Sequence, residues 1–263
     1  MTTTVMPGAE AWSHRPDRPG DADPGVGVLV LHGFTGNPSS VRGLAEAFAA
    51  AGYHVESPRL PGHGTTIDEM LHTSWNDWVG EVHRAVTELA SRVDAFVLAG
   101  LSMGGSLALW TAINQGHVGA EPAGVVCVNP ATQPQPPEVI EMLHEMLDDG
   151  MEVMPGIGAD IADPDAVDLA YEGTPVRPLL SLIADGLTPM RSRYGEITVP
   201  LRLFTSRQDH VVAPADSEHL AATFGGPVEH TWLERSYHVA TQDFDRDLVF
   251  DGAVEFVGRV AGA

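Results

Sequence analysis

The chain has 263 residues, of which 43% are hydrophobic, so it can bury one core of single-domain size, and we expect one domain over residues 1–263. Its 36 acidic residues outnumber its 14 basic ones, and the net charge of −22 disfavours nucleic acid and anionic membrane surfaces as partners. The basic residues are all arginines, which excludes enzyme classes that depend on a P-loop, Schiff-base or kinase lysine.

Short apolar runs alternate with helical patterns along the first half of the chain. The run "VGVLVL" is typical of a strand buried on both faces of a parallel sheet. The helical pattern that follows has Ser39 or Ser40 as its expected N-cap and Gly52 as its expected stop. Further strands are expected at "HVESP", "DAFVLAG" and "AGVVCVN", and further helices at "SWNDWVGEVHRAVTELASR" and "SLALWTAINQG". The single cysteine, Cys127, is expected to be buried in a strand and forms no internal disulfide.

The alternation stops after residue 130 and resumes near residue 190. The segment between is rich in proline and methionine, and we interpret it as a cap inserted over the sheet at about residues 130–190. Beyond it, "PLRLFTS" and "PVEHTWLE" predict strands, and "APADSEHLAATF" and the stretch near 245–260 predict helices. This alternation predicts an α/β fold, a doubly wound and mostly parallel sheet with right-handed crossovers.

The stretch "GLSMGG" follows one expected strand and precedes an expected helix. Gly100, Ser102 and Gly104 fit the pattern G-x-S-x-G, which has a catalytic meaning in this strand-to-helix context. A sharp turn here would hold the serine in a strained backbone conformation, and side chains at positions 100 and 104 would collide with neighbouring backbone. We therefore predict that Ser102 is a nucleophile, in preference to a plain glycine-rich turn.

A serine nucleophile requires a base to take its proton and a carboxylate to orient that base. In a doubly wound sheet the reacting groups gather at the carboxyl ends of the strands. Asp209 comes soon after "PLRLFTS" and His238 soon after "PVEHTWLE", which gives the chain order Ser, Asp, His. These three residues are the predicted catalytic triad.

Several other residues compete for the roles of acid and base: Asp216, Asp243, Asp245, His210 and His63. Asp216 lies in an expected helix. Asp243 and Asp245 follow His238 in the sequence and so break the expected chain order. His210 is adjacent to Asp209 and is expected to be a surface residue beside the acid. His63 lies in a glycine-rich loop and is expected to have a structural role.

An oxyanion formed by serine attack needs backbone N–H donors. One is expected from Met103, the residue after the nucleophile, and the second from Phe34, after the strand that ends at "LVLHG". Gly33 and Gly36 would let the backbone approach a substrate closely.

Four segments together resemble the α/β-hydrolase superfamily, and within it the bacterial monoacylglycerol lipases and related small carboxylesterases. They are "LVLHGFTGNPSSVRGLAEAFAAAGYHVESPRLPGHG", "GLSMGGSLAL", "QDHVV" and "SYHVAT". The resemblance runs from about residue 26 to the end and is weakest at 130–190. It implies an α/β-hydrolase fold, Ser102, Asp209 and His238 as the triad, Phe34 and Met103 as the oxyanion pair, and a small cap that forms an apolar acyl tunnel.

The cap segment offers further candidates. In "VIEMLHEML" the residues Val139, Met142, Leu143, Met146 and Leu147 share one helical face, which could contact an acyl chain or simply pack on the sheet. Asp168 or Glu172 could reach a glycerol hydroxyl, and the sequence assigns the role to neither. The run "HEMLD" lacks the second histidine of a zinc-binding helix, so we expect no metal site.

These observations predict a cofactor-free serine hydrolase that cleaves a small neutral carboxylic ester through an acyl-enzyme on Ser102. A monoacylglycerol is the preferred substrate. A short-chain carboxylesterase is the alternative, and a noncatalytic binding scaffold of the same fold is a remote one. We expect a monomer or homodimer in the cytoplasm without stable membrane insertion, because no run approaches about 20 apolar residues and the first residues lack the apolar part of a secretion signal.

Overall fold

The computed structural model describes residues 4–16, 25–115, 119–156 and 159–262. The fold is built around a central β-sheet. Within these residues the sheet has seven strands in the order β1-β3-β2-β4-β5-β8-β9. Their bounds are β1 (Trp12–His14), β2 (Val26–Leu31), β3 (His54–Ser57), β4 (Ala95–Leu101), β5 (Gly124–Val128), β8 (Leu201–Ser206) and β9 (Val228–Leu233). All neighbouring strands pair in parallel except β1, which is antiparallel to β3. The doubly wound, mostly parallel α/β sheet predicted from the sequence is therefore present.

The inner strands are buried along nearly their whole length. Every residue of β2 and β5 is buried, and so is every residue of β4 after Ala95. Strands covered on both faces need continuous apolar sequence, which is why these runs were recognisable. The edge strand β1 was not predicted, because its three residues "WSH" are only partly buried and too short to show a pattern.

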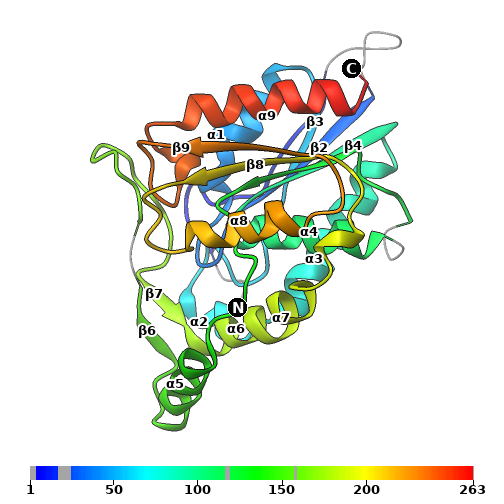
Figure 1. Cartoon of the computed structure of the whole chain (residues 1–263). Helices are drawn as coiled ribbons and strands as arrows, with labels where there is room; N and C mark the ends of the chain where they lie inside the picture. The colour runs from blue at the N-terminus through cyan, green and yellow to red at the C-terminus, as the bar shows by residue number, and fades with distance from the viewer. Residues whose placement is uncertain (1–3, 17–24, 116–118, 157–158, 263) are drawn as a thin grey trace.

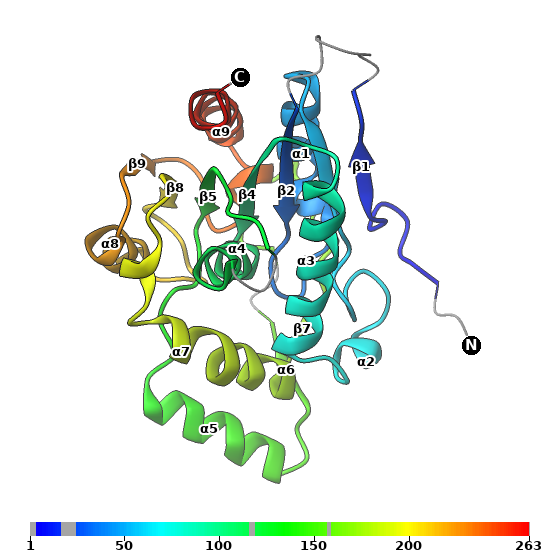
Figure 2. The ribbon, with the colours of Figure 1, turned by 90° about the vertical axis from the view of Figure 1, so that its right-hand side faces the viewer.

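Helices cover both faces of the sheet. Figure 1 shows α1 (Arg42–Ala50) and α9 (Arg246–Val260) above it, and α3 (Trp75–Ala90), α4 (Met103–Ile113) and α8 (Pro214–Thr223) below it. The same two layers are seen in Figure 2. Successive residues of a strand point to opposite faces, so β2 contributes Leu29 and Leu31 to one core and Val28 and Val30 to the other.

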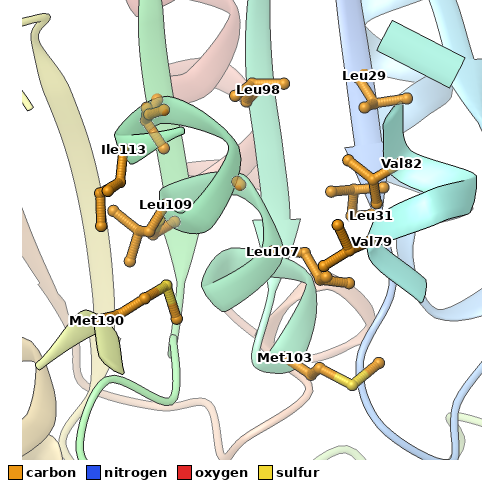
Figure 3. Close-up of a cluster of buried hydrophobic side chains, with 14 of the residues drawn as sticks. Leu29, Leu31, Val79, Val82, Leu98, Met103, Leu107, Leu109, Ile113 and Met190 are labelled. Atoms are coloured by element: carbon orange, nitrogen blue, oxygen red, sulfur yellow. The ribbon is translucent and has the colours of Figure 1, made fainter. Parts of the chain in front are cut away.

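The larger core lies between the sheet and the helices α3 and α4. Figure 3 shows the contributions of three elements to it: Leu29 and Leu31 from β2, Val79 and Val82 from α3, and Leu107, Leu109 and Ile113 from α4. The side chain of Met103 also belongs to this core and is completely buried. This packing places the start of α4 against β2, and Ser102 lies directly before that point.

Two helix starts differ from the sequence prediction. Neither Ser39 nor Ser40 caps α1: a 3₁₀ turn, η2 (Pro38–Val41), precedes that helix, and Asn37 caps the turn by accepting the N–H of Ser39 at 3.0 Å. The helix predicted at "SLALWTAINQG" begins earlier, at Met103, directly after the serine. Gly52 ends α1 as expected, with a φ of 94° that favours glycine.

The chain leaves the sheet between β5 and β8. Residues 137–190, here called the cap segment, contain α5 (Pro137–Asp148), β6 (Val153–Pro155), β7 (Gly173–Pro175), α6 (Val176–Ser181), the π-helix η4 (Leu182–Leu187) and α7 (Thr188–Met190). Strands β6 and β7 form a separate antiparallel pair. Figure 1 shows these elements gathered beyond α3 and α4, on the same side of the sheet.

Short elements complete the described part of the chain: α2 (Ile67–Met70), η5 (Tyr194–Glu196) and η6 (Ala240–Gln242). Among the described helices, none has both the length and the apolar character needed to cross a bilayer.

Candidate active site

The strand order reverses between β2 and β4, which marks where a ligand site is expected. From β2 the chain moves outward to β3 and then returns to the other side of β2 to form β4. Ligands of open α/β sheets bind beyond the carboxyl ends of the strands at such a reversal. Gly33 follows β2 there and Ser102 follows β4, and a Cβ added to Gly33 would lie 3.3 Å from the Cβ of Ser102. The two loops are therefore in contact.

Ser102 has a strained backbone. Its φ is 54° and its ψ is −122°, a conformation that side-chain-bearing residues rarely adopt. The glycines on either side make this turn possible: a Cβ on Gly100 would lie 2.2 Å from the carbonyl carbon of Gly104, and a Cβ on Gly104 would lie 2.1 Å from the carbonyl oxygen of Leu31. The steric reason for the G-x-S-x-G pattern is thus the one expected from the sequence.

Asp209 and His238, far apart in the sequence, meet above the sheet. The Nδ1 of His238 lies 2.8 Å from Oδ2 of Asp209, and both side chains are buried, with 9% and 1% exposed. The other carboxylate oxygen, Oδ1, accepts the N–H groups of Val211 and Val212, each at 2.8 Å. A carboxylate held this way keeps a proton on Nδ1 of the neutral imidazole and leaves Nε2 as the nitrogen that can accept one.

A cavity of about 660 Å³ brings the candidate groups together. Ser102, His238, Phe34 and Met103 all line it. Met103 is the first residue of α4, so its N–H belongs to the first turn and has no acceptor within the helix. Because the Met103 side chain is directed into the core, its backbone amide is the part that can serve the cavity.

The competing carboxylates bond to main-chain N–H groups and not to the imidazole of His238. Asp216, Asp243 and Asp245 each accept main-chain N–H groups from neighbouring loops. Asp209, by contrast, bonds the imidazole ring of His238. The structure therefore places Asp209, and not these alternatives, beside the candidate base.

Two residues near the site were missed by sequence reasoning. Asn129, at the end of β5, donates from Nδ2 to the carbonyl oxygen of His238 at 2.8 Å. Asp160, in the cap segment, accepts the N–H of His238 at 3.1 Å through Oδ2. Asn129 could have been found, because it is a polar residue directly after a buried strand at the reactive edge. Asp160 gave no such signal, since the cap segment has no regular pattern around it.

The predicted apolar stripe on α5 does not line the cavity. Leu143 is its one buried member, and it packs with Val176 and Ile183, while Met142 is 47% exposed. The stripe therefore packs on the cap's own helices, which makes both the acyl-chain interpretation and packing on the sheet wrong. The apolar wall comes instead from Met154 and from residues of α6 and η4 that include Leu179, Leu182 and Leu187. A π-helix at such a place is common at functional sites.

Of the two acids considered for an alcohol group, the structure places one in the cavity. Asp168 lines it, and burial raises the pKa of its carboxyl, while hydrogen bonds to the amides of Ala170 and Leu169 and the nearby His238 oppose this. Its Oδ1 is buried and has no hydrogen-bond partner within the described residues. Glu172 is exposed, and its side chain is not part of the lining that the structure describes.

The competing histidines have other contacts. The side chain of His210 is 56% exposed and bonds Oδ1 of Asp160 at 2.7 Å. His63 is fully buried, and its Nδ1 donates to the carbonyl oxygen of Pro61 at 2.9 Å. His32 lies beside it, donates from Nδ1 to Gly33 and accepts the N–H of Leu60 through Nε2. His32 and His63 thus support the loop after β2 as neutral, buried rings.

These buried rings predict a loss of stability in mild acid. Burial lowers the pKa of His63 from 6.5 to about 4 and that of His32 well below 6.5. Below pH 6.5 the unfolded chain binds protons that the folded chain does not, so the free energy of unfolding should fall by up to about 1.4 kcal/mol per pH unit for each ring. For His63 the fall ends near its folded pKa. Urea unfolding between pH 7 and pH 5 measures this slope.

The matched variants are His63→Gln, which should reduce the slope, and His144→Gln on the exposed face of α5, which should leave it unchanged. A free energy of unfolding that does not change between pH 7 and pH 5 would contradict the assignment of neutral buried rings.

Comparison with known proteins gives a consistent result. Residues 22–245 match the family model described as "Serine aminopeptidase, S33". The chain is 37% identical over 241 residues to a thermostable monoacylglycerol lipase of Bacillus sp. (strain H-257), covering 90% of this chain and 92% of that one. It is 28% identical over 236 residues to a carboxylesterase of Bacillus subtilis (strain 168), with 89% and 92% covered.

A solved structure is also closely similar. One of two metagenome-derived lipolytic enzymes, LipS and LipT, superposes with a TM-score of 0.88 and 38% identity, covering 97% of this chain and 100% of the other. The family match spans most of the chain, and the fold and the strained serine turn agree with it. The chain therefore belongs to the serine aminopeptidase S33 family of serine hydrolases, within the α/β-hydrolase fold.

Proposed function

We propose that this protein hydrolyses neutral carboxylic esters through an acyl-enzyme on Ser102 and that its substrate is a monoacylglycerol. The observation that carries the proposal is the hydrogen-bonded pair of Asp209 and His238, whose imidazole lines the same cavity as the serine on its strained turn. A serine, a histidine and a buried carboxylate in this relation are the parts of a catalytic triad.

The proposed reaction begins with attack by Oγ of Ser102 on the ester carbonyl carbon. His238 takes the serine proton on Nε2, and the N–H groups of Phe34 and Met103 stabilise the oxyanion. When the tetrahedral intermediate collapses, the C–O bond to the alcohol breaks and the alcohol leaves with the proton from His238. Water then attacks the acyl-enzyme with His238 as base, which releases the fatty acid and restores the serine.

Features of the cavity support a monoacylglycerol as the substrate. The cap segment supplies an apolar wall, which suits an acyl chain, and the carboxylate residue Asp168 lines the same cavity, which suits a glycerol hydroxyl. The 37% identity to a monoacylglycerol lipase points to the same substrate.

Removing the Asp168 carboxylate should weaken recognition of the glycerol part alone. We expect Asp168→Ala to lower kcat/KM for a monoacylglycerol about 10- to 100-fold, the loss expected for one hydrogen bond to a charged group. The ethyl ester of the same fatty acid lacks the glycerol hydroxyls, so its kcat/KM should change little. Steady-state hydrolysis of the two esters makes the comparison.

Glu172→Ala is the matched control, because this exposed acid lies four residues further along the chain. It should affect neither ester. Equal losses on the two esters in Asp168→Ala would contradict a role in alcohol recognition.

A short-chain carboxylesterase is the second candidate, and the 28% identity to a carboxylesterase favours it. The cavity volume of about 660 Å³ with an apolar wall favours longer chains. Rates measured on monoacylglycerols of increasing chain length decide between the two. A steep fall beyond short chains would identify the carboxylesterase.

A noncatalytic scaffold would not need Ser102, Asp209 and His238 to be arranged as a catalytic triad. Covalent labelling of Ser102 by an organophosphonate, read by mass spectrometry, should occur in the wild-type protein and be absent in Ser102→Ala. A wild-type protein that neither labels nor hydrolyses any ester would support the scaffold.

Three further expectations from the sequence stay predictions. They are a single domain over residues 1–263 with the cap at about 130–190, a location in the cytoplasm, and a monomer or homodimer. Limited proteolysis, cell fractionation and light scattering test them in turn.

A further inference from the structure

We propose that Asp160, a residue of the cap segment, is a positioning residue that fixes the loops carrying Asp209 and His238 relative to each other. The inference rests on the proposed roles of those two residues as acid and base. It assigns the cap a part in the chemistry in addition to the shape of the cavity.

Asp160 is bonded to both loops at once. Its Oδ2 accepts the N–H of His238 and the N–H of His210, each at 3.1 Å. His210 is the residue directly after Asp209, so one carboxylate oxygen joins the loop of the acid to the loop of the base. The carbonyl oxygen of Asp160 also accepts the N–H of Val239 at 3.1 Å, so two consecutive amides of the histidine loop bond this one residue.

Because Asp160 is buried, the loss of these hydrogen bonds would be costly. The residue is 8% exposed, and its second oxygen, Oδ1, is bonded by the His210 ring at 2.7 Å. Removing the carboxylate would leave the N–H of His238 without its acceptor in a buried place, which favours a shift of the loop. Such a shift would change the 2.8 Å contact between His238 and Asp209, and general base catalysis depends on that geometry.

A second buried carboxylate also links the cap segment to the loop that carries His238. In this case the carboxylate comes from the side of the histidine loop and the N–H groups come from the cap segment. Asp243, which follows the histidine loop and is fully buried, accepts the N–H groups of Ala162 and Asp163 from the cap segment at 2.8 and 3.1 Å. It also accepts the N–H of Tyr237 at 2.8 Å. The cap segment near residue 160 is thus anchored to the histidine loop by carboxylates from both sides, which gives Asp160 a fixed place from which to act.

The chemistry of the contacts tells which substitution should preserve the function. In Asp160→Asn the amide oxygen can replace Oδ2 and accept both N–H groups, and its NH₂ group can face the half-exposed His210 ring, which can change tautomer. In Asp160→Ala neither N–H group has an acceptor. Asn should therefore rescue what Ala loses.

The test measures kcat and KM of the full-length protein on one ester. Asp160→Ala should lower kcat about 10- to 100-fold, the order expected for a misplaced catalytic group, and should leave KM nearly unchanged. Asp160→Asn should recover most of the lost kcat. Asp165→Ala, the same change on an exposed acid of the same cap segment, should behave as wild type. If Asp160→Ala does not fold, Asp160→Ser takes its place, because its short hydroxyl cannot reach both loops.

A spectroscopic readout keeps this inference separate from the proposed function. The proton between His238 and Asp209 should give a low-field resonance in wild type and Asp160→Asn that is lost or broadened in Asp160→Ala. An unchanged kcat and resonance in Asp160→Ala would overturn the inference, and so would an Asn variant as impaired as the Ala variant. A wild-type protein that hydrolyses no ester would overturn the proposed function, while the resonance would still test the role of Asp160.

Discussion

Ser102→Ala should lower kcat for ester hydrolysis on the order of 10⁶-fold, which removes about 8 kcal/mol of transition-state stabilisation. In the proposed mechanism Oγ forms the bond to the acyl group, and alanine has no group that can take its place. The fold should persist, because alanine is no larger than serine and the native residue already tolerates a φ of 54°. Single-turnover hydrolysis with purified protein measures the loss, and circular dichroism and thermal unfolding check the fold.

Ser106→Ala is a matched control for this variant. Ser106 lies one turn further along α4, is also buried, and donates to the carbonyl oxygen of Ala131 at 2.6 Å. Its loss should cost about 1 kcal/mol of stability and leave kcat largely intact. If Ser102→Ala kept a rate near that of wild type, the nucleophile would have to be another residue.

Asp209→Asn should lower kcat on the order of 10⁴-fold, because it reverses the hydrogen-bonding role of His238. Oδ1 of Asp209 accepts two backbone N–H groups, from Val211 and Val212. In the variant these amides hold the Asn oxygen at that position and direct the NH₂ group toward Nδ1 of His238. The imidazole must then carry its proton on Nε2, where it cannot accept the proton of Ser102.

Asp216→Asn provides the comparison for the acid, since Asp216 also lines the cavity and was the nearest alternative in the sequence. Its carboxylate accepts the N–H groups of Thr132 and Gln133, which an asparagine oxygen can also accept. A larger loss of kcat in Asp216→Asn than in Asp209→Asn would show that the wrong acid was chosen. The ratio of the two kcat values, measured on one ester, decides.

The parts of the fold that sequence reasoning predicted share a physical cause. Strands β2, β4 and β5 are covered by helices on both faces, so their sequences had to be almost wholly apolar and were easy to recognise. The glycines around Ser102 were interpretable for a related reason: any side chain at position 100 or 104 would lie within about 2 Å of backbone. Where steric or burial constraints act on neighbouring residues, they produce a pattern that can be recognised in the amino-acid sequence.

The errors arose where contacts between distant segments decided the outcome. The cap of α1 was placed at Ser39 or Ser40, but a 3₁₀ turn begun by Asn37 precedes the helix, and Asn37 also donates to the carbonyl oxygen of Leu169 in the cap segment. The stripe on α5 has the period of a helix packed on a partner, and that period does not say which partner. The partner is the cap's own α6 and η4.

The amino-acid sequence by itself predicted the buried strands of the sheet and the strained turn at Ser102, because each depends on residues that are neighbours in the chain. Only the tertiary structure decided which carboxylate meets His238 and that Asp160 joins the two loops. Those outcomes depend on hydrogen bonds between residues separated by 29 to 78 positions in the chain, and no local pattern records such bonds.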